Sequence, residues 1–162
     1  MHIIWETVEV AEKKLKKFKE LSIIEKIREE LIQLERFTTE ANNERRRCGM
    51  SEVCAECGKA GNSCCAQGVE FKYSAELIML NLYFGVKIPF EPEHNSMCFF
   101  LTKNGCCLFV RDVFCINFIC EKIKEKISSE KINKLRELEG FQLNLQFKLE
   151  NFLKKVDKLF TF

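Results

Sequence analysis

The sequence predicts a mainly α-helical protein, with two long amphipathic helical arms packed around a central cysteine-rich metal-binding module that contains a short β-hairpin. Three observations predict this class. Apolar residues recur every three or four positions at both ends, all ten cysteines lie between Cys48 and Cys120, and an Asn-Gly dipeptide separates two short apolar runs. We expect a single domain, 1–162, made of an N-terminal helical arm (1–47), the cysteine-rich module (48–120) and a C-terminal helical arm (121–162).

The N-terminal arm has an apolar stripe of helical period, with Lys and Glu at most other positions. Ser22 and Glu25 have the spacing of a capping box, which favours two helices with a bend over one long helix. The run Arg45-Arg46-Arg47 at its end is interpreted as a solvated helix terminus rather than a nucleic-acid contact. The stripe consists of Val8, Ala11, Leu15, Phe18, Leu21, Ile24, Ile27, Leu31, Leu34, Phe37 and Ala41.

The C-terminal arm carries a second stripe that no proline interrupts, although Gly140 weakens its helix. Apolar stripes of this length need a partner, so we expect the two arms to pack against each other and to cap the cysteine module. A homodimer or a protein partner that docks on the arms is the alternative. The stripe consists of Ile123, Ile127, Ile132, Leu135, Leu138, Phe141, Leu145, Leu149, Phe152, Val156 and Leu159.

The middle of the chain is irregular but contains two local signals. Ser74 is a predicted N-cap for a helix that runs through Tyr83 and is ended by Gly85. Asn104-Gly105 lies between two short apolar runs and predicts the turn of the hairpin.

Composition narrows the class of protein. The formal net charge is only +2, which disfavours nucleic acid, and no apolar run approaches the roughly eighteen residues of a membrane span. The first residues lack the pattern of a secretory signal, so we expect the protein to stay in the reducing cytoplasm. In that compartment ten cysteines favour metal or redox chemistry over a disulfide framework.

The spacing of the cysteines indicates thiolate metal ligands. Cys54 and Cys57 form a C-x2-C knuckle, and Gly58 is expected to take the positive φ that such turns need. A cation makes deprotonation of clustered thiols favourable, and thiolate-rich sites select zinc or iron–sulfur clusters over magnesium or calcium. The predicted ligands are Cys54, Cys57, Cys64, Cys65, Cys98, Cys106, Cys107, Cys115 and Cys120.

An all-cysteine set suits zinc and iron alike, including an iron–sulfur cluster. The two vicinal pairs predict two neighbouring centres, or one cluster with a spare thiol, because adjacent cysteines rarely aim both sulfurs at one ion. Cys48 is expected to be a buried spare, and His94 a loop residue rather than a ligand. Arg111 is interpreted either as a hydrogen-bond donor to the thiolate centre or as a surface residue.

This pattern resembles the YkgJ-like cysteine-cluster family of zinc- or iron-chelating proteins, over about residues 54–120. Two departures from the family pattern are the wide spacing between Cys57 and Cys64, and Asp112 in place of proline. The resemblance implies a metal-chelating centre and leaves open which of Cys106 and Cys107 is a ligand. It is carried by C54-x2-C57, C64-C65, C98-F-F-L101, G105-C-C-L108, R111-D-V-F-C115 and F118-I-C120.

Three functions follow as hypotheses. The first is a metal-binding protein that holds zinc or iron through its clustered thiolates. The second is an iron–sulfur-dependent redox or transferase enzyme, with an apolar setting that includes Phe99 and Phe114 to shield the cluster. The third is a metal-stabilised interaction module whose arms recruit a partner. The sequence does not decide whether the protein is an enzyme, since it shows no acid–base set or cofactor fingerprint.

Overall fold

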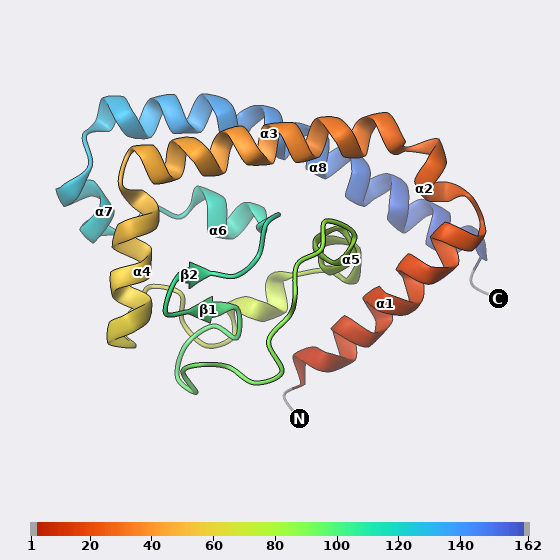
Figure 1. Ribbon diagram of the computed structural model, residues 1–162, viewed down its shortest axis with the longest axis horizontal. Helices are drawn as coiled ribbons and strands as arrows, with labels where there is room; N and C mark the ends of the chain where they lie inside the picture. The colour runs from red at the N-terminus through yellow and green to blue at the C-terminus, as the bar shows by residue number, and fades with distance from the viewer. Residues whose placement is uncertain (1–2, 161–162) are drawn as a thin grey trace.

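The computed structural model describes residues 3–160, and they form a mainly helical fold with one two-stranded antiparallel hairpin, which confirms the predicted helical content and the hairpin (Figure 1). The elements are α1 (Ile4–Glu20), α2 (Ile23–Lys26), α3 (Arg28–Arg47), α4 (Met50–Ala60), the 3-10 helix η1 (Val69–Lys72), α5 (Ala75–Tyr83), β1 (Leu101–Thr102), β2 (Gly105–Cys106), α6 (Val113–Asn117), α7 (Glu121–Lys126) and α8 (Ser129–Phe160).

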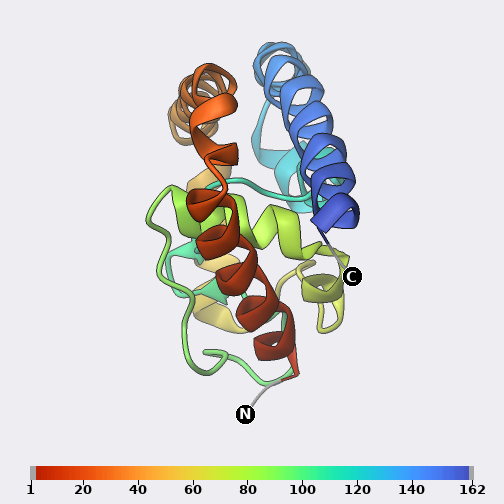
Figure 2. The same ribbon diagram turned by 90° about the vertical axis from the view of Figure 1, so that its right-hand side faces the viewer.

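The two longest helices, α3 and α8, lie side by side and run in opposite directions (Figures 1 and 2). Helix α1 turns away from α3 and packs on α5, which lies beneath the pair. Helix α4 descends from the end of α3 and contacts both strands of the hairpin. The region between α4, the hairpin and α6 therefore lies under the α3–α8 pair.

The N-terminal arm bends at Ser22, as predicted, but not through a capping box. Ser22 takes the left-handed conformation, with φ of 55°, and its side chain makes no cap hydrogen bond. The chain instead leaves α1 through the backbone N–H groups of Leu21 and Ser22, which donate to the carbonyls of Lys17 and Lys19. The capping-box prediction was therefore wrong, although the break in the helix is real.

Helix α8 buries the predicted stripe only in part, through Leu135, Leu149 and Val156. The predicted stripe residues Phe141 and Leu159 are 61% and 74% exposed. Three polar side chains, Glu139, Gln142 and Gln146, are buried in their place. They are buried because they have partners on α3 and in the loop before α6, which an apolar stripe does not reveal.

Amide side chains from three helices hold this loop. Asn81 of α5 donates to the carbonyl of Val110 at 2.8 Å and accepts from the N–H groups of Phe109 and Val110 at 2.9 Å. Gln146 of α8 donates to the carbonyl of Arg111 at 2.9 Å, and Asn42 of α3 donates to that of Phe109 at 3.4 Å. Residues 109–111 are thereby fixed between α3, α5 and α8.

The helix and the hairpin predicted in the middle of the chain are confirmed. The Ser74 hydroxyl accepts from the Leu77 N–H at 3.1 Å and caps α5, and Gly85 follows that helix with φ of 82°. The hairpin is present, but its turn is Lys103-Asn104 rather than Asn104-Gly105: Leu101 pairs with Cys106 and Thr102 with Gly105, which is the first residue of β2 and has φ of 94°.

The segment that carries Cys54 and Cys57 is not a knuckle. Both residues lie within helix α4, and so does Gly58, which therefore does not have the expected positive φ. Gly58 has another role, because a Cβ at this position would overlap the carbonyl oxygen of Thr102. Its lack of a side chain lets α4 lie directly against the hairpin.

The buried apolar side chains form two clusters. The larger joins α1, α3, α5, the segment around Phe99 and Phe100, and the C-terminal half of α8. The smaller joins Cys48, which follows α3, to α4, α7 and Leu135 near the start of α8. Among the described residues, none of the helices has the length and apolar character needed to cross a membrane.

Candidate functional site

Six of the ten cysteines line one small cavity of about 70 Å³. A single water needs roughly 10–15 Å³ of such space, so the cavity has room for several atoms. Its cysteines come from five separate parts of the chain, and apolar side chains form most of the remaining wall. The six are Cys54, Cys64, Cys65, Cys98, Cys106 and Cys115.

Backbone pairing brings the first cysteine group to the second. Ala66 forms a β-bridge with Met97, and the N–H of Cys98 donates to the carbonyl of Cys65 at 2.8 Å. Cys64 and Cys98, far apart in sequence, therefore stand on neighbouring extended segments. Two short stretches of extended chain thus carry three cavity thiols.

The hairpin decides the placement of the second vicinal pair. Cys106 faces Leu101 in the ladder and lines the thiol-lined cavity, while Cys107, whose N–H donates to the carbonyl of Phe100 at 2.9 Å, does not. Cys107 instead lines a second cavity on the other side of Cys106. Successive residues of an extended chain point to opposite sides, and only Cys106 of this pair lines both cavities.

Two short helices position the last two cysteines. Asp112 caps α6 by accepting from the Phe114 N–H at 2.8 Å, which places Cys115 in the first turn of that helix. Aspartate is among the residues that favour this position at the start of a helix. Cys120 is the N-cap of α7, and its carbonyl accepts from the Ile123 N–H at 3.1 Å.

Electrostatic coupling divides the thiols into two groups. In addition to burial, the nearby thiols of Cys64, Cys120 and Cys57 raise the pKa of Cys54, and the thiol of Cys65 raises that of Cys64. Cys98, Cys106, Cys107 and Cys115 form the other group, in which, in addition to burial, Cys107 and Cys115 raise the pKa of both Cys98 and Cys106. The groups share the cavity, and Cys64 acts on Cys115 across it.

Burial favours the neutral form of these thiols. It raises the pKa of Cys54 to about 11, and the Arg45 guanidinium opposes part of that rise. Burial likewise raises the pKa of Cys98 to about 12 and moves the pKa of Cys106 well upward. Without a cation the buried thiols are expected to remain protonated at neutral pH.

Two polar groups in the cavity wall were not singled out from the sequence. Tyr73 is 4% exposed and Arg45 is 5% exposed. The Tyr73 hydroxyl and the Arg45 Nε have no partner of hydrogen-bond geometry among the described residues. Buried polar atoms without partners are costly, so both favour a polar or charged occupant of this cavity.

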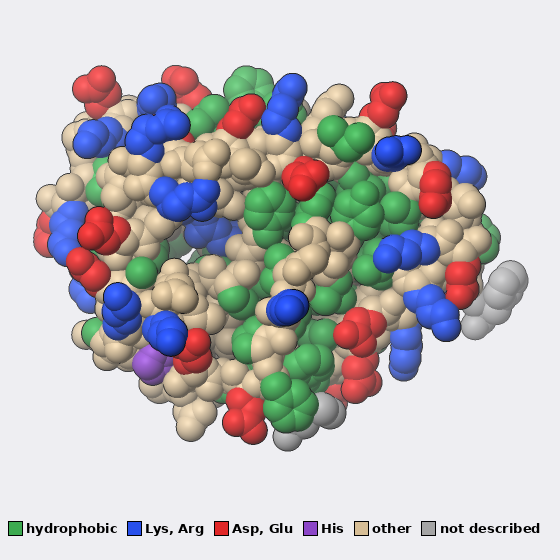
Figure 3. All heavy atoms as spheres, in the orientation of Figure 1, with side chains coloured by type: hydrophobic (Ala, Val, Ile, Leu, Met, Phe, Trp, Pro, Cys, Tyr) green, Lys and Arg blue, Asp and Glu red, His purple; other side chains and the backbone are tan. Residues whose placement is uncertain are grey.

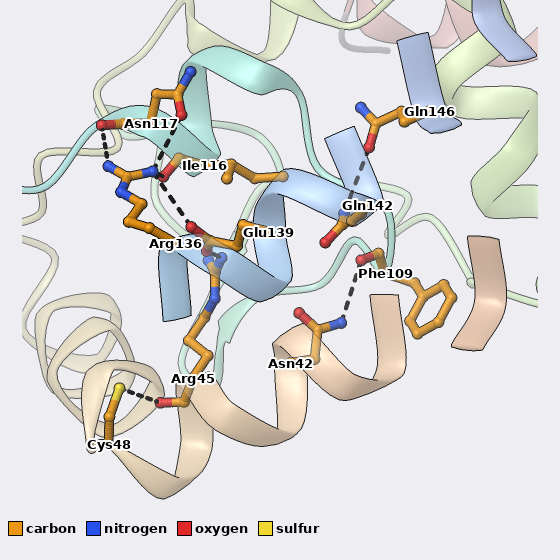
Figure 4. A network of polar contacts seen from close by, with 10 residues as sticks. All are labelled: Asn42, Arg45, Cys48, Phe109, Ile116, Asn117, Arg136, Glu139, Gln142 and Gln146. Atoms are coloured by element: carbon orange, nitrogen blue, oxygen red, sulfur yellow. Dashed lines mark hydrogen bonds and ion pairs between the residues drawn. The ribbon is translucent and has the colours of Figure 1, made fainter. Parts of the chain in front are cut away.

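Arg45 is held by a buried ion pair, which corrects the prediction of a solvated terminus for this residue. Its guanidinium contacts the carboxylate of Glu139 on α8, and Arg136 donates to the other carboxylate oxygen at 3.3 Å (Figure 4). Burial raises the pKa of Glu139, and both arginines oppose that rise. The sequence of three arginines does not indicate which one is buried, because the partner that allows Arg45 to be buried, Glu139, lies far away in the sequence on α8.

The remaining predicted site residues differ in how close they lie to the thiol-lined cavity. Cys57 accepts a hydrogen bond from the Lys122 ammonium at 3.7 Å and, like Cys120, adjoins Cys54 rather than the cavity. Cys48 lies in the smaller apolar cluster and donates to the carbonyl of Arg45 at 3.4 Å. Arg111 lines both cavities.

Within residues 3–160, no three His, Cys, Asp or Glu side chains meet as closely as metal ligands do. The thiols surround a space instead of meeting at a point. Comparison of the chain with protein-family models, curated proteins and solved structures finds no match.

Proposed function

We propose that this protein binds zinc or iron through thiolates that surround the thiol-lined cavity. The observation that carries the proposal is the convergence of six cysteines, from five parts of the chain, on one cavity of about 70 Å³. Buried thiols next to one another lose solvation and repel one another when ionised, whereas a cation reverses both effects. A purely structural role for six cysteines leaves this convergence without a cause.

The donor set fits a thiophilic metal. Cys54, Cys64, Cys98, Cys106 and Cys115 offer sulfur from opposite walls, and no carboxylate lines the cavity among the described residues. Thiolate sulfur binds zinc and iron–sulfur clusters well and binds magnesium or calcium poorly. The size of the cavity and the two electrostatic groups support one cluster or two neighbouring ions.

Buried aromatic side chains would shield an iron–sulfur cluster from solvent, but only some of the aromatic side chains near the cavity are buried. Phe99 and Phe100 are buried in the core beside Cys98, but Phe114 and Phe118, which line the cavity, are 47% and 51% exposed. Solvent exposure and hydrogen bonds tune the potential of such clusters, so a redox enzyme remains the alternative within this proposal. Thiolate ligands also need reduced cysteines, which is consistent with a cytoplasmic location.

The identity of the metal is tested by purifying the whole chain without oxygen. A brown protein that contains iron and acid-labile sulfide supports an iron–sulfur cluster and excludes a site that binds only zinc. A colourless protein with stoichiometric zinc supports the zinc site and excludes the cluster. Absence of both metals, after reconstitution with each under reducing conditions, would overturn the proposal.

The ligands are tested by serine substitutions with a matched control. We expect Cys54→Ser and Cys98→Ser, which change two thiols of the cavity wall, to lower metal content strongly. Cys48→Ser, in the same part of the chain as Cys54 but in the smaller apolar cluster, is expected to retain the metal. Equal metal loss in all three variants would show that folding, rather than ligation, is lost.

A second candidate function, interaction through the helical arms, is favoured by one feature of α8. Phe141 and Phe147 are 61% and 67% exposed on this helix, while its buried face is partly polar. The occupant to test first is a second copy of the chain. Sedimentation showing a dimer that Phe147→Ser dissociates supports this function, and a monomer at all concentrations removes the homodimer.

A further inference from the structure

A second, larger cavity of about 340 Å³ lies between the end of α3, the start of α4 and the hairpin. Figure 3 shows a hollow in this region of the surface, with Lys and Arg side chains around it. Its volume is in the range of small-molecule sites. The polar lining comprises Asn42, Arg45, Arg46, Ser51, Asn104 and Arg111, and no carboxylate lines it among the described residues.

The three arginines are neutralised only in part. Arg45 is paired with Glu139 but keeps its Nε without a partner at 5% exposure. Arg46 is exposed and donates to the neutral side chain of Asn43. Arg111 forms no side-chain hydrogen bond or ion pair within residues 3–160, although Gln146 fixes its backbone. Nearby Glu44 does not reduce this excess, because it pairs with Arg47 and Lys134 outside the cavity.

The start of α4 adds to the positive potential. Ser51 lies in the first turn of this eleven-residue helix, where unpaired N–H groups and the helix dipole favour negative charge. Arginine binds carboxylate and phosphate through two parallel hydrogen bonds, which a planar guanidinium matches in shape. Asn42 and Asn104 supply neutral donors in the same wall.

The geometry points to a binding site for a small molecule that carries a carboxylate or phosphate group, held by Arg46 and Arg111 with Arg45 behind them. The cavity shares Arg45, Cys54, Cys106 and Arg111 with the thiol-lined cavity, so the ligand lies beside that site. From the sequence Arg111 is either a hydrogen-bond donor to the thiolate centre or a surface residue, whereas in this site it would bind the anionic group of the ligand. The inference does not depend on metal binding.

The test measures binding of sodium phosphate and sodium succinate to the whole chain by calorimetry and by the shift in Tm. Sodium chloride at equal ionic strength is the reference, because salt alone screens clustered charges. We expect one bound phosphate or succinate per chain. Phosphate alone identifies a phosphate-bearing ligand, succinate alone a carboxylate, and both support the site.

The variants separate a built site from general positive charge. Arg111→Gln is expected to weaken binding at least tenfold, and Arg111→Lys to weaken it less. Arg46→Gln, on an exposed side chain, serves if Arg111→Gln does not fold. The control is Arg36→Gln, on the same helix α3 but outside the cavity, where Arg36 is exposed beside Glu40.

Unchanged binding in Arg36→Gln with loss in the cavity variants supports the inference. Equal weakening in the control and the cavity variants would overturn it, and so would the absence of any effect of phosphate and succinate beyond that of chloride. Either failure leaves the proposed metal centre untouched, because no metal enters the measurement.

Discussion

The two cavities of this protein share one wall and differ in chemistry. The smaller is lined mainly by thiols and apolar side chains, whereas the larger combines arginine, amide and hydroxyl groups with three cysteines, Leu108 and Phe109. Arg45, Cys54, Cys106 and Arg111 belong to both. The difference shows how few residues separate the two environments: in the hairpin, Cys106 borders both cavities and Cys107 only the larger one. Substitutions in the shared wall should therefore affect both cavities, and those on one side only one.

The largest expected effect is that of Arg45→Met, which removes the charged centre of the shared wall. It leaves Glu139 buried with Arg136 as its remaining partner, so we expect a loss of about 3 kcal/mol or more in the free energy of unfolding. Urea denaturation measures this change.

The control for Arg45 is the double variant Arg45→Met/Glu139→Met. Removing both charges takes away the unpaired carboxylate, so this variant should be more stable than Arg45→Met alone. If the double variant is the less stable of the two, the ion pair is not what Arg45 contributes.

Gly58→Ala is expected to disturb both cavities by pushing α4 away from the hairpin. The new Cβ would overlap the Thr102 carbonyl oxygen, and the strain should lower the free energy of unfolding by about 1–3 kcal/mol. Thermal or urea unfolding measures it.

Gly140→Ala is the matched control for Gly58. Gly140 is an exposed residue within helix α8, and no atom lies within 4 Å of an added Cβ. The same change should therefore stabilise the protein by about 0.5–1 kcal/mol. Stabilisation by both substitutions would show that α4 does not depend on its contact with β1.

The helices could be predicted from periodicity, but the partners of their polar residues could not. The N-terminal stripe is largely buried as expected, because Val8, Phe18 and Leu31 face a core that any amphipathic helix needs. On α8 the buried face depends on Arg45 and on the carbonyl of Arg111, which hydrogen-bond to Glu139 and Gln146. Such long-range pairs leave no periodic signal in a single sequence.

The candidate site shows the same limit. Cysteine spacing predicted nine ligands, of which six line the thiol-lined cavity, and their positions depend on α4 being a helix and on the bridge between Ala66 and Met97. Cys106 and Cys107 were indistinguishable in sequence, and only the hairpin register separates them. Tyr73 escaped notice because a single tyrosine between two predicted elements carries no motif.

Alkaline pH should distinguish the thiol-lined cavity from the arginine-lined one in the metal-free protein. The pKa of Cys54 rises from its ordinary 9.0 to about 11 on folding, and that of Cys98 to about 12. Between pH 9 and 12 the unfolded chain loses thiol protons that the folded chain keeps. Below pH 9 the thiols are protonated in both states and do not lower the free energy of unfolding. As the pH rises from 9 to 12, the free energy of unfolding should fall, because only the unfolded chain releases these protons.

Denaturation at a series of pH values measures this dependence, with Cys54→Ala/Cys98→Ala as the comparison. Lysines also titrate in this range, so the informative quantity is the difference in slope between the two proteins. The variant should show the shallower decline above pH 9. Identical slopes would mean that burial of these two thiols does not shift their titration.

The smallest effect should come from Cys107→Ser, and the neighbouring Cys106→Ser sharpens it. Burial raises the pKa of both thiols, but Cys106 lines the thiol-lined cavity whereas Cys107 lines only the arginine-lined one. We expect Cys106→Ser to lose most of the bound metal, and Cys107→Ser to retain it. The stability of Cys107→Ser should change by about 0.5 kcal/mol or less, as is usual at partly exposed positions. Metal content and urea denaturation of the two variants measure these effects. A larger metal loss from Cys107→Ser than from Cys106→Ser would mean that Cys107, and not Cys106, is the metal ligand. The metal would then lie in the arginine-lined cavity rather than in the thiol-lined one.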